Sequence, residues 1–151
     1  MAGQDHLLSK AFLCTGAAAY VFGQCVTSAA GSALDPNQMI QVTAGGGSAF
    51  AVSPLGLVQE NIDLVKVTTL KAYASVAISG IAYGIYNTGT LTLGTPLIPS
   101  VAVAGRLDAV TASAAGRPQV GYYLGDAGGA AGTGSAAGDI IAVMLTPGAR
   151  C

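Results

Sequence analysis

The side chains able to do chemistry are few in this sequence of 151 residues, and their spacing does not predict a catalytic site. The one histidine, His6, lies near the first residue. We do not expect it to be held within hydrogen-bond reach of a partner, as a general base must be. Asp126 and Asp139 flank a glycine- and alanine-rich stretch in the manner of paired carboxylates, but aspartate takes both positions equally well as a turn residue. We therefore expect no enzymatic activity and no small-molecule substrate.

The cysteines and glycine-rich segments predict no metal or cofactor site. Zinc sites use four Cys or His ligands at close spacing, whereas Cys14 and Cys25 are 11 residues apart and form no CxxC motif. The glycine-rich segments 45–47 and 128–134 lack the Lys-Ser or Lys-Thr that follows a phosphate-binding loop. Both segments are expected to be loops.

Three cysteines, an odd number, leave two alternatives open. Cys14 and Cys25 either form a disulfide, within or between chains, or act as free thiols that pack like small apolar side chains. Cys151 is either incidental or reaches another chain.

The charge content is the most informative feature of the composition. Six basic and seven acidic residues make 13 charges, whereas an average domain of this length, with about 25% charged residues, carries roughly 38. At the same time 52% of the residues are hydrophobic. Such a surface is expected to be covered by copies of itself, by a partner or by lipid. Six scattered cations cannot form the basic patch of a nucleic-acid-binding protein, so no nucleic acid is expected as a partner.

A membrane partner is not expected either. The stretch between Lys71 and Arg106 has no charge and exceeds the roughly 20 residues that span a bilayer. Serines, glycines, a turn at 87–90 and two prolines interrupt it. A signal peptide over residues 11–33 is disfavoured by the long polar segment that precedes it.

Residues 1–34 are predicted to form an N-terminal arm or short helix. Asp5 is a candidate helix cap, and the apolar residues at positions 7, 8, 11 and 12 share one helical face. The segment either packs on its own domain or orders on a neighbouring subunit. Its large apolar side chains are the candidate interface residues, namely Leu7, Leu8, Phe12, Tyr20 and Phe22.

Residues 35–151 predict a mainly β domain, a small β-sandwich or barrel. Short runs rich in β-branched and aromatic residues alternate with Gly, Pro and Asn turns. Segment 54–63 is expected to be a connection, and turns are expected at Ser79-Gly80 and at 87–89. The predicted strands are 39–43, 49–52, 64–68, 74–78, 81–86, 96–98, 101–104, 120–124 and 140–145.

Five segments between residues 65 and 148 together resemble a known family. Their order and spacing are similar to those of tailed-phage capsid cement (head decoration) proteins, which follow the pattern G-x-A, G-x-P-L, G-R-L, V-G-x-x-L and G-D-x-I-x-V-x-L. Residues 1–34 have no counterpart in that pattern. The segments are Val76–Gly84, Leu91–Ile98, Gly105–Val110, Val120–Ala127 and Gly138–Leu145.

The resemblance implies a structural virion protein without an active site. Such a protein forms a homotrimer at threefold or quasi-threefold positions on the outer surface of an assembled phage capsid. There it contacts the major capsid protein and stabilises the shell against internal pressure. It would be assembled in the bacterial host cytoplasm and remain in the virion.

Three charged residues of the matching region are candidates to orient this trimer, or are solvated turn charges: Arg106, Asp108 and Arg117. Two other functions stay open as alternatives. One is another virion assembly component, such as a tail or minor capsid protein. The other is a secreted or membrane-associated binding module that uses the apolar N-terminal stretch.

Overall fold

The computed structural model describes residues 8–29, 39–43, 53–88, 91–110, 116–126 and 136–146. Of these, 55% lie in strands and 6% in a helix, so the predicted mainly β fold is confirmed. No helix within these ranges is long and apolar enough to cross a membrane. The elements are β1 (Leu8–Cys14), β2 (Cys25–Ser28), β3 (Met39–Val42), β4 (Pro54–Val58), α1 (Leu64–Thr69), β5 (Tyr73–Thr88), β6 (Pro96–Pro99), β7 (Leu107–Ala109), β8 (Gly121–Asp126) and β9 (Ile140–Leu145).

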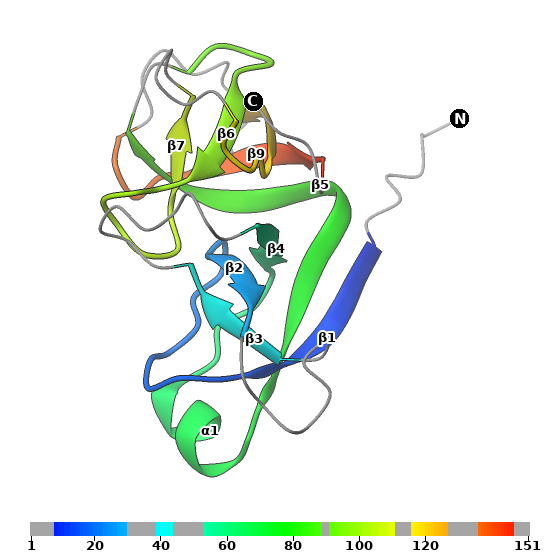
Figure 1. Ribbon diagram of the computed structural model, residues 1–151, viewed down its shortest axis with the longest axis vertical. Helices are drawn as coiled ribbons and strands as arrows, with labels where there is room; N and C mark the ends of the chain where they lie inside the picture. Colours follow the sequence, from blue (N-terminus) through cyan, green and yellow to red (C-terminus); the bar gives the residue numbers. More distant parts are fainter. Residues whose placement is uncertain are drawn as a thin grey trace.

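The strands form two closed five-stranded circuits that share the long strand β5 (Figure 1). The first barrel has the order β1-β3-β2-β4-β5 and closes through the pairing of β1 with residues 73–79 of β5. The second barrel has the order β5-β7-β6-β8-β9 and closes through the pairing of β9 with residues 80–85 of β5. Each circuit contains one parallel pair, β1 with β3 or β5 with β7, and otherwise antiparallel pairs. The second barrel therefore repeats the topology of the first.

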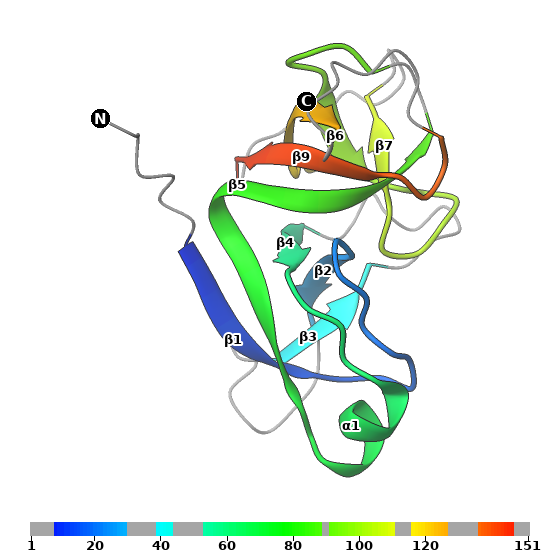
Figure 2. The same ribbon diagram turned by 180° about the vertical axis from the view of Figure 1, so that it is seen from behind.

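Strand β5 joins the two barrels by bending instead of turning back. Figures 1 and 2 show it rising from α1 beside β1 and then running across the molecule beside β9. The bend falls at Gly80, whose φ of 91° is costly for any residue with a Cβ. The turn predicted at Ser79-Gly80 is therefore wrong, because glycine here redirects a strand that continues to Thr88.

Two hydrophobic cores stabilise the fold, and the strands between them are buried on both faces. Val26 of β2 and Val58 of β4 point into the core of the first barrel. Their neighbours Cys25 and Leu57 point into the core of the second barrel. Because successive side chains of a strand face opposite ways, these short strands contribute to both cores. The two barrels are therefore packed directly against each other.

Several predicted strands are confirmed. Segment 140–145 coincides with β9, and the strands expected at 39–43, 96–98 and 120–124 correspond to β3, β6 and β8 within one or two residues. The two strands expected at 74–78 and 81–86 are parts of the single strand β5. The strand expected at 49–52 lies outside the described residues.

The short helix considered for the N-terminal segment and the strand predicted at residues 64–68 are both wrong. Leu8–Cys14 is strand β1, because pairing along β5 satisfies its backbone and buries Phe12 and Cys14, two residues apart, on one face. Residues 64–68, expected as a strand, belong to helix α1, where only Val67 is buried.

Two further segments differ from the prediction. Residues 54–58, expected in a connection, form β4 and bring Leu57 into the core. Residues 101–104, expected as a strand, form a turn because the Ser100 hydroxyl accepts hydrogen bonds from the Ala102 and Val103 amides, at 3.2 and 3.1 Å.

Candidate functional site

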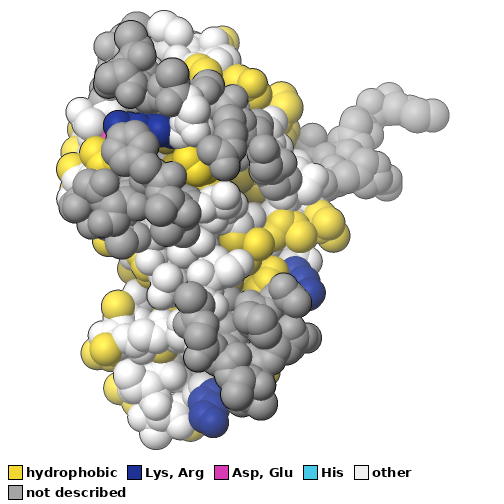
Figure 3. Space-filling model, in the orientation of Figure 1, with side chains coloured by type: hydrophobic (Ala, Val, Ile, Leu, Met, Phe, Trp, Pro, Cys, Tyr) yellow, Lys and Arg dark blue, Asp and Glu magenta, His cyan; other side chains and the backbone are white. Residues whose placement is uncertain are grey.

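An exposed row of large apolar side chains runs along the outside of the molecule where the two barrels meet. We call Leu8, Ile81, Tyr83 and Met144 the apolar stripe. They are 57%, 38%, 41% and 44% exposed. Leu8 lies opposite Ser79 and Met144 lies opposite Ile81, so the bend of β5 brings β1 and β9 to the same edge. Figure 3 shows hydrophobic side chains gathered over the start of β1 and the bend of β5.

The stripe arises because successive side chains of β5 face opposite sides of the strand. Ile81 and Tyr83 point outward, whereas Ala82 between them and Gly84 after them are buried. The Phe22 ring extends the stripe, since its centroid lies 6.0 Å from that of Tyr83. Four large apolar residues on neighbouring strand positions form a contiguous surface, which in soluble proteins marks a contact site.

The sequence-predicted interface residues of the N-terminal segment divide into two groups. Phe12 and Tyr20 belong to the core of the first barrel, at 3% and 1% exposure. The Tyr20 hydroxyl lies 2.7 Å from the Thr15 carbonyl oxygen and 2.8 Å from that of Ile40, and burial raises the pKa of this phenol. Leu8 and the partly buried Phe22 are the two that reach the surface; Leu7 lies outside the described residues.

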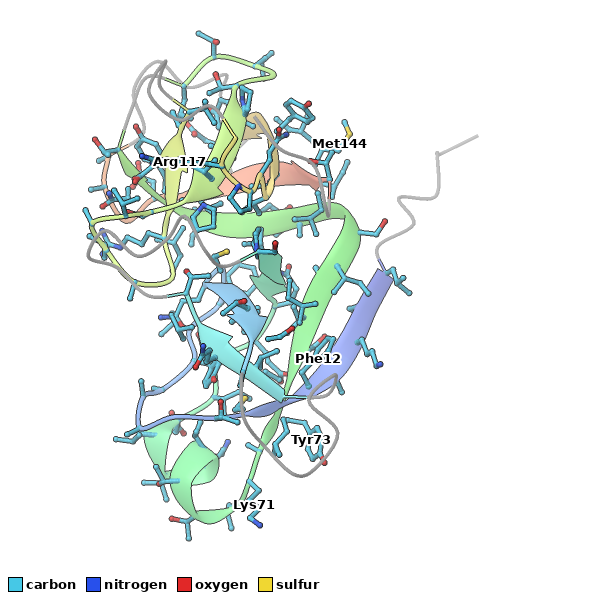
Figure 4. All side chains as sticks on the ribbon, in the orientation of Figure 1. Phe12, Lys71, Tyr73, Arg117 and Met144 are labelled. Carbon is cyan, nitrogen blue, oxygen red and sulfur yellow. The ribbon has the colours of Figure 1, made fainter. Side chains whose placement is uncertain are left out.

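The candidate charges of the second barrel are not a cluster of free surface charges. Asp108 is buried, and its carboxylate accepts hydrogen bonds from the Asn87 side-chain amide at 2.8 Å and the Val101 amide at 3.3 Å. It therefore helps to hold the turn after β6. Arg106 and Arg117 are partly buried in the same barrel, where Figure 4 labels Arg117.

The cysteines are free thiols in separate cores. Cys14 lies in the core of the first barrel and Cys25 in that of the second. Burial, and secondarily the Glu60 carboxylate, raises the pKa of Cys14 to about 11. Burial raises the pKa of Cys25 to about 12. Thiols with such high pKa values are poor nucleophiles at neutral pH. Cys151 lies outside the described residues.

Asp126 and Asp139, considered from the sequence as paired carboxylates, each accept a hydrogen bond from a residue three positions earlier. Asp126 accepts a hydrogen bond from the Tyr123 hydroxyl at 2.8 Å, and Asp139 accepts one from the Ala136 amide at 2.7 Å. Across the described ranges, no three His, Cys, Asp or Glu side chains come together in a group that could hold a metal ion.

Sequence reasoning missed most of the exposed apolar surface. Ile81, Tyr83 and Met144 were assigned to strands without regard to which face they occupy. The alternation of large and small residues in Ile81-Ala82-Tyr83-Gly84 was the available signal. Leu64, Val65, Leu70 and Tyr73, exposed around α1, were missed because a strand was expected there.

Comparison with known proteins finds a likeness in fold among solved structures. No family model matches the sequence, and no curated protein matches it. Among solved structures, the chain is similar to the crystal structure of the head fiber gp8.5 N base of bacteriophage phi29, with a TM-score of 0.55 and 10% sequence identity. The match covers 93% of this chain and 94% of the other. At this identity the likeness establishes a shared fold.

Proposed function

We propose that this chain is a structural, non-catalytic protein of a phage virion that attaches to the outside of the head. The observation that carries the proposal is the likeness in fold, almost end to end, to a head fiber base. The cement-family resemblance of residues 65–148 points to the same part of a virion. The apolar stripe is a second support, because a surface of this kind suits lasting contact with protein.

We propose further that three copies associate through the apolar stripe. Homo-oligomers close by symmetry, and a stripe without lysine, arginine, aspartate or glutamate can be buried without desolvating a charge. Leu8 and Phe22 would then connect residues 1–34 to a neighbouring copy, as expected of an arm. Burying each large side chain fully contributes on the order of 1.5–3 kcal/mol.

The proposed trimer acts as a cement protein at threefold or quasi-threefold positions. It bridges neighbouring major capsid subunits, and because it binds the assembled shell it stabilises that shell by mass action. Three attachment points on one trimer add avidity.

The base of a head fibre is the second candidate, favoured by the description of the structural neighbour. A base also sits on the head, but it anchors a further projecting part. The two functions differ in copy number and in what lies outward of the domain, and both can be read from a cryo-EM map of the particle.

The experiment uses heads of the phage whose genome encodes this chain, prepared without it, with purified protein added back. Heads that carry the chain should release their DNA at a higher temperature than bare heads, in proportion to occupancy. Attachment should survive moderate salt, because screened ion pairs contribute little. Failure of the chain to attach to heads would remove the proposal; attachment with unchanged thermal release would remove the cement role and favour the fibre base.

The stripe is tested with a matched pair of variants. Met144→Asp should convert the trimer to monomers in light scattering, whereas Leu93→Asp, which places the same charge at an exposed leucine that is not part of the stripe, should leave the trimer intact. Retention of the oligomer by Met144→Asp would exclude the stripe as its interface.

A further inference from the structure

Helix α1 exposes apolar side chains that the fold does not use. Leu64, Val65 and Leu70 are 45%, 67% and 69% exposed, and Val67 alone of the helix is buried. These residues lie at the end of the molecule opposite the second barrel (Figure 1). A six-residue helix with two large apolar residues in solvent and a third at its C-cap has more hydrophobic surface than its own packing requires.

A groove opens beside this helix. It lies between α1, the end of β1 and the start of β5, and has a volume of about 510 Å³, within the range of ligand-binding clefts. Its lining includes Leu13 and Cys14 of β1, Val67 of α1, and then Lys71 and Tyr73. Figure 4 shows Lys71 and Tyr73 at the same end of the molecule as α1.

Some polar groups of the groove already make hydrogen bonds within the fold, and others do not. The Thr15 hydroxyl donates to the Ile40 carbonyl at 2.7 Å, and the Thr68 hydroxyl donates to the Leu64 carbonyl at 2.9 Å. Within the described ranges, neither the Lys71 ammonium nor the Tyr73 hydroxyl has a hydrogen-bond partner. Lys71 is also the single cationic or carboxylate side chain in the lining. The groove thus offers an apolar floor and one cation with a phenol nearby.

The backbone at Lys71 is a separate observation. Its φ of 50° lies in the left-handed region, at the position after a helix where glycine is strongly preferred. The Ala72 amide donates to the Lys66 carbonyl at 3.2 Å, the bond that holds this helix end. A lysine here costs on the order of 1 kcal/mol relative to glycine, and such strain persists where a side chain has a task.

We propose that this groove binds an extended segment of a partner protein, with a large apolar side chain in the groove and an adjacent carboxylate on Lys71. A protein fits better than a small acid because Leu64, Val65 and Leu70 extend the apolar surface beyond the groove itself. A nucleic acid would need more than one cation. The identification of the partner as a subunit of the phage shell rests on the proposed function. The chemistry of the bound segment, an apolar side chain next to a carboxylate, does not depend on it.

The first test is an NMR titration of the isotope-labelled full chain with a short blocked peptide containing leucine next to aspartate. Amide shifts should change at the groove, at Gly16, Thr68 and Tyr73. The same peptide with asparagine should bind about tenfold more weakly, because a hydrogen bond to a charged group is lost. Absence of shifts at the groove, or equal binding of both peptides, would overturn the proposal. Tighter binding of dodecanoate than of the peptide at the same residues would also overturn it, in favour of a lipid ligand.

Two lysine variants separate the groove from general charge. Lys71→Met should abolish the difference between the aspartate and asparagine peptides, whereas Lys66→Met, in the preceding helix α1 but outside the lining, should keep it. Both variants keep a non-glycine residue at their position, so both should melt as the parent does. Equal effects of the two substitutions would overturn the role of Lys71.

The particle assay then distinguishes this inference from the proposed function. If the unmodified chain does not attach to heads, the proposed function fails, and the peptide titration still decides the groove chemistry. If the unmodified chain attaches, Lys71→Met should lower its affinity for heads about tenfold while Lys66→Met leaves it unchanged. Equal attachment of all three proteins would exclude the shell as the groove's partner.

Discussion

The two barrels share a topology but distribute their hydrophobic residues differently. Among the described residues, the core of the second barrel contains 14 buried residues, including Cys25, Leu57 and Ala77 contributed from strands of the first. The core of the first barrel contains ten within the same ranges. The first barrel also carries α1, in which Leu64 and Val65 face solvent and Val67 is buried, together with the strained Lys71.

The difference lies in the origin of the core side chains of each barrel. The second barrel draws apolar side chains inward from both halves of the chain, so it is the structural centre of the molecule. Both barrels leave apolar groups exposed, the first at α1 and Leu8 and the second at Ile81, Tyr83 and Met144. Surfaces of this kind suit contact with another molecule. The repeated topology therefore carries two separate exposed apolar surfaces, the apolar stripe where the barrels meet and the surface at α1.

The largest expected effect tests whether the barrels are equivalent in construction. Gly56 of β4 and Gly121 of β8 occupy matching positions in the two circuits. A Cβ on Gly56 would lie 2.0 Å from the Ala77 carbonyl oxygen, and one on Gly121 would lie 2.1 Å from that of Met144. Gly56→Ala and Gly121→Ala should each lower the free energy of unfolding by about 3 kcal/mol or more, since a backbone must move. Urea denaturation measures both.

A matched control is Gly94→Ala, where a Cβ meets nothing within 4 Å and only the positive φ is unfavourable. Its cost should be near 1 kcal/mol. A mild effect of one strand-glycine substitution beside a severe effect of the other would break the equivalence of the two circuits.

The next effect tests whether the barrels unfold together. Leu57 belongs to a strand of the first barrel and Leu97 to a strand of the second, yet both are fully buried in the same core. Leu57→Ala and Leu97→Ala should each cost about 3 kcal/mol. Both should lower hydrogen-exchange protection in β3 and β8 alike, because the shared core couples them. Loss of protection confined to one barrel would contradict this coupling.

The sequence predicted the mainly β fold class better than the path of the chain and the pairing of its strands. Strand β9 was located to the residue because Ile140–Leu145 is a compact apolar run between turn signals. The two-barrel arrangement was not foreseen, because it depends on β5 passing through Gly80 as one strand. Glycine has the same local signature in a bend, a bulge and a turn, and only the strands that pair on either side decide among them.

The candidate surfaces were predictable only in part. Leu8, Phe12 and Tyr20 were grouped as candidate interface residues, but only Leu8 of these three is exposed, whereas Phe12 and Tyr20 belong to the core of the first barrel. Helix α1 was missed because Val65, Val67 and Thr68 favour strands, a local preference that tertiary context overrides here. The groove combines residues from three elements and has no signature in any one of them.

The two buried thiols allow the opening of each barrel to be measured separately. The pKa of Cys14 is raised to about 11 and that of Cys25 to about 12, from 9.0. Because the folded state favours the neutral thiol, the associated stability is fully present below pH 9 and is lost as the pH rises toward these values. In a Cys151→Ser variant at pH 8, alkylation should be about 100-fold slower at Cys14 and about 1000-fold slower at Cys25 than in urea. Equal rates at the two cysteines would mean that both thiols react only through the common opening of the two barrels that their shared core predicts, and that their pKa values in the folded state do not set the rates.

The smallest expected effect is a gain in stability in the first barrel. Lys71 occupies a left-handed position after α1, so Lys71→Gly should raise the free energy of unfolding by about 1 kcal/mol and the melting temperature by a few degrees. The same change removes the cation of the groove, so attachment of the peptide or the head should weaken as stability rises. The matched substitution Lys66→Gly, inside the helix, should lower stability by a similar amount. A loss of stability in Lys71→Gly would mean that the lysine side chain already stabilises the free chain, and the strain at this helix end would then need no partner to account for it.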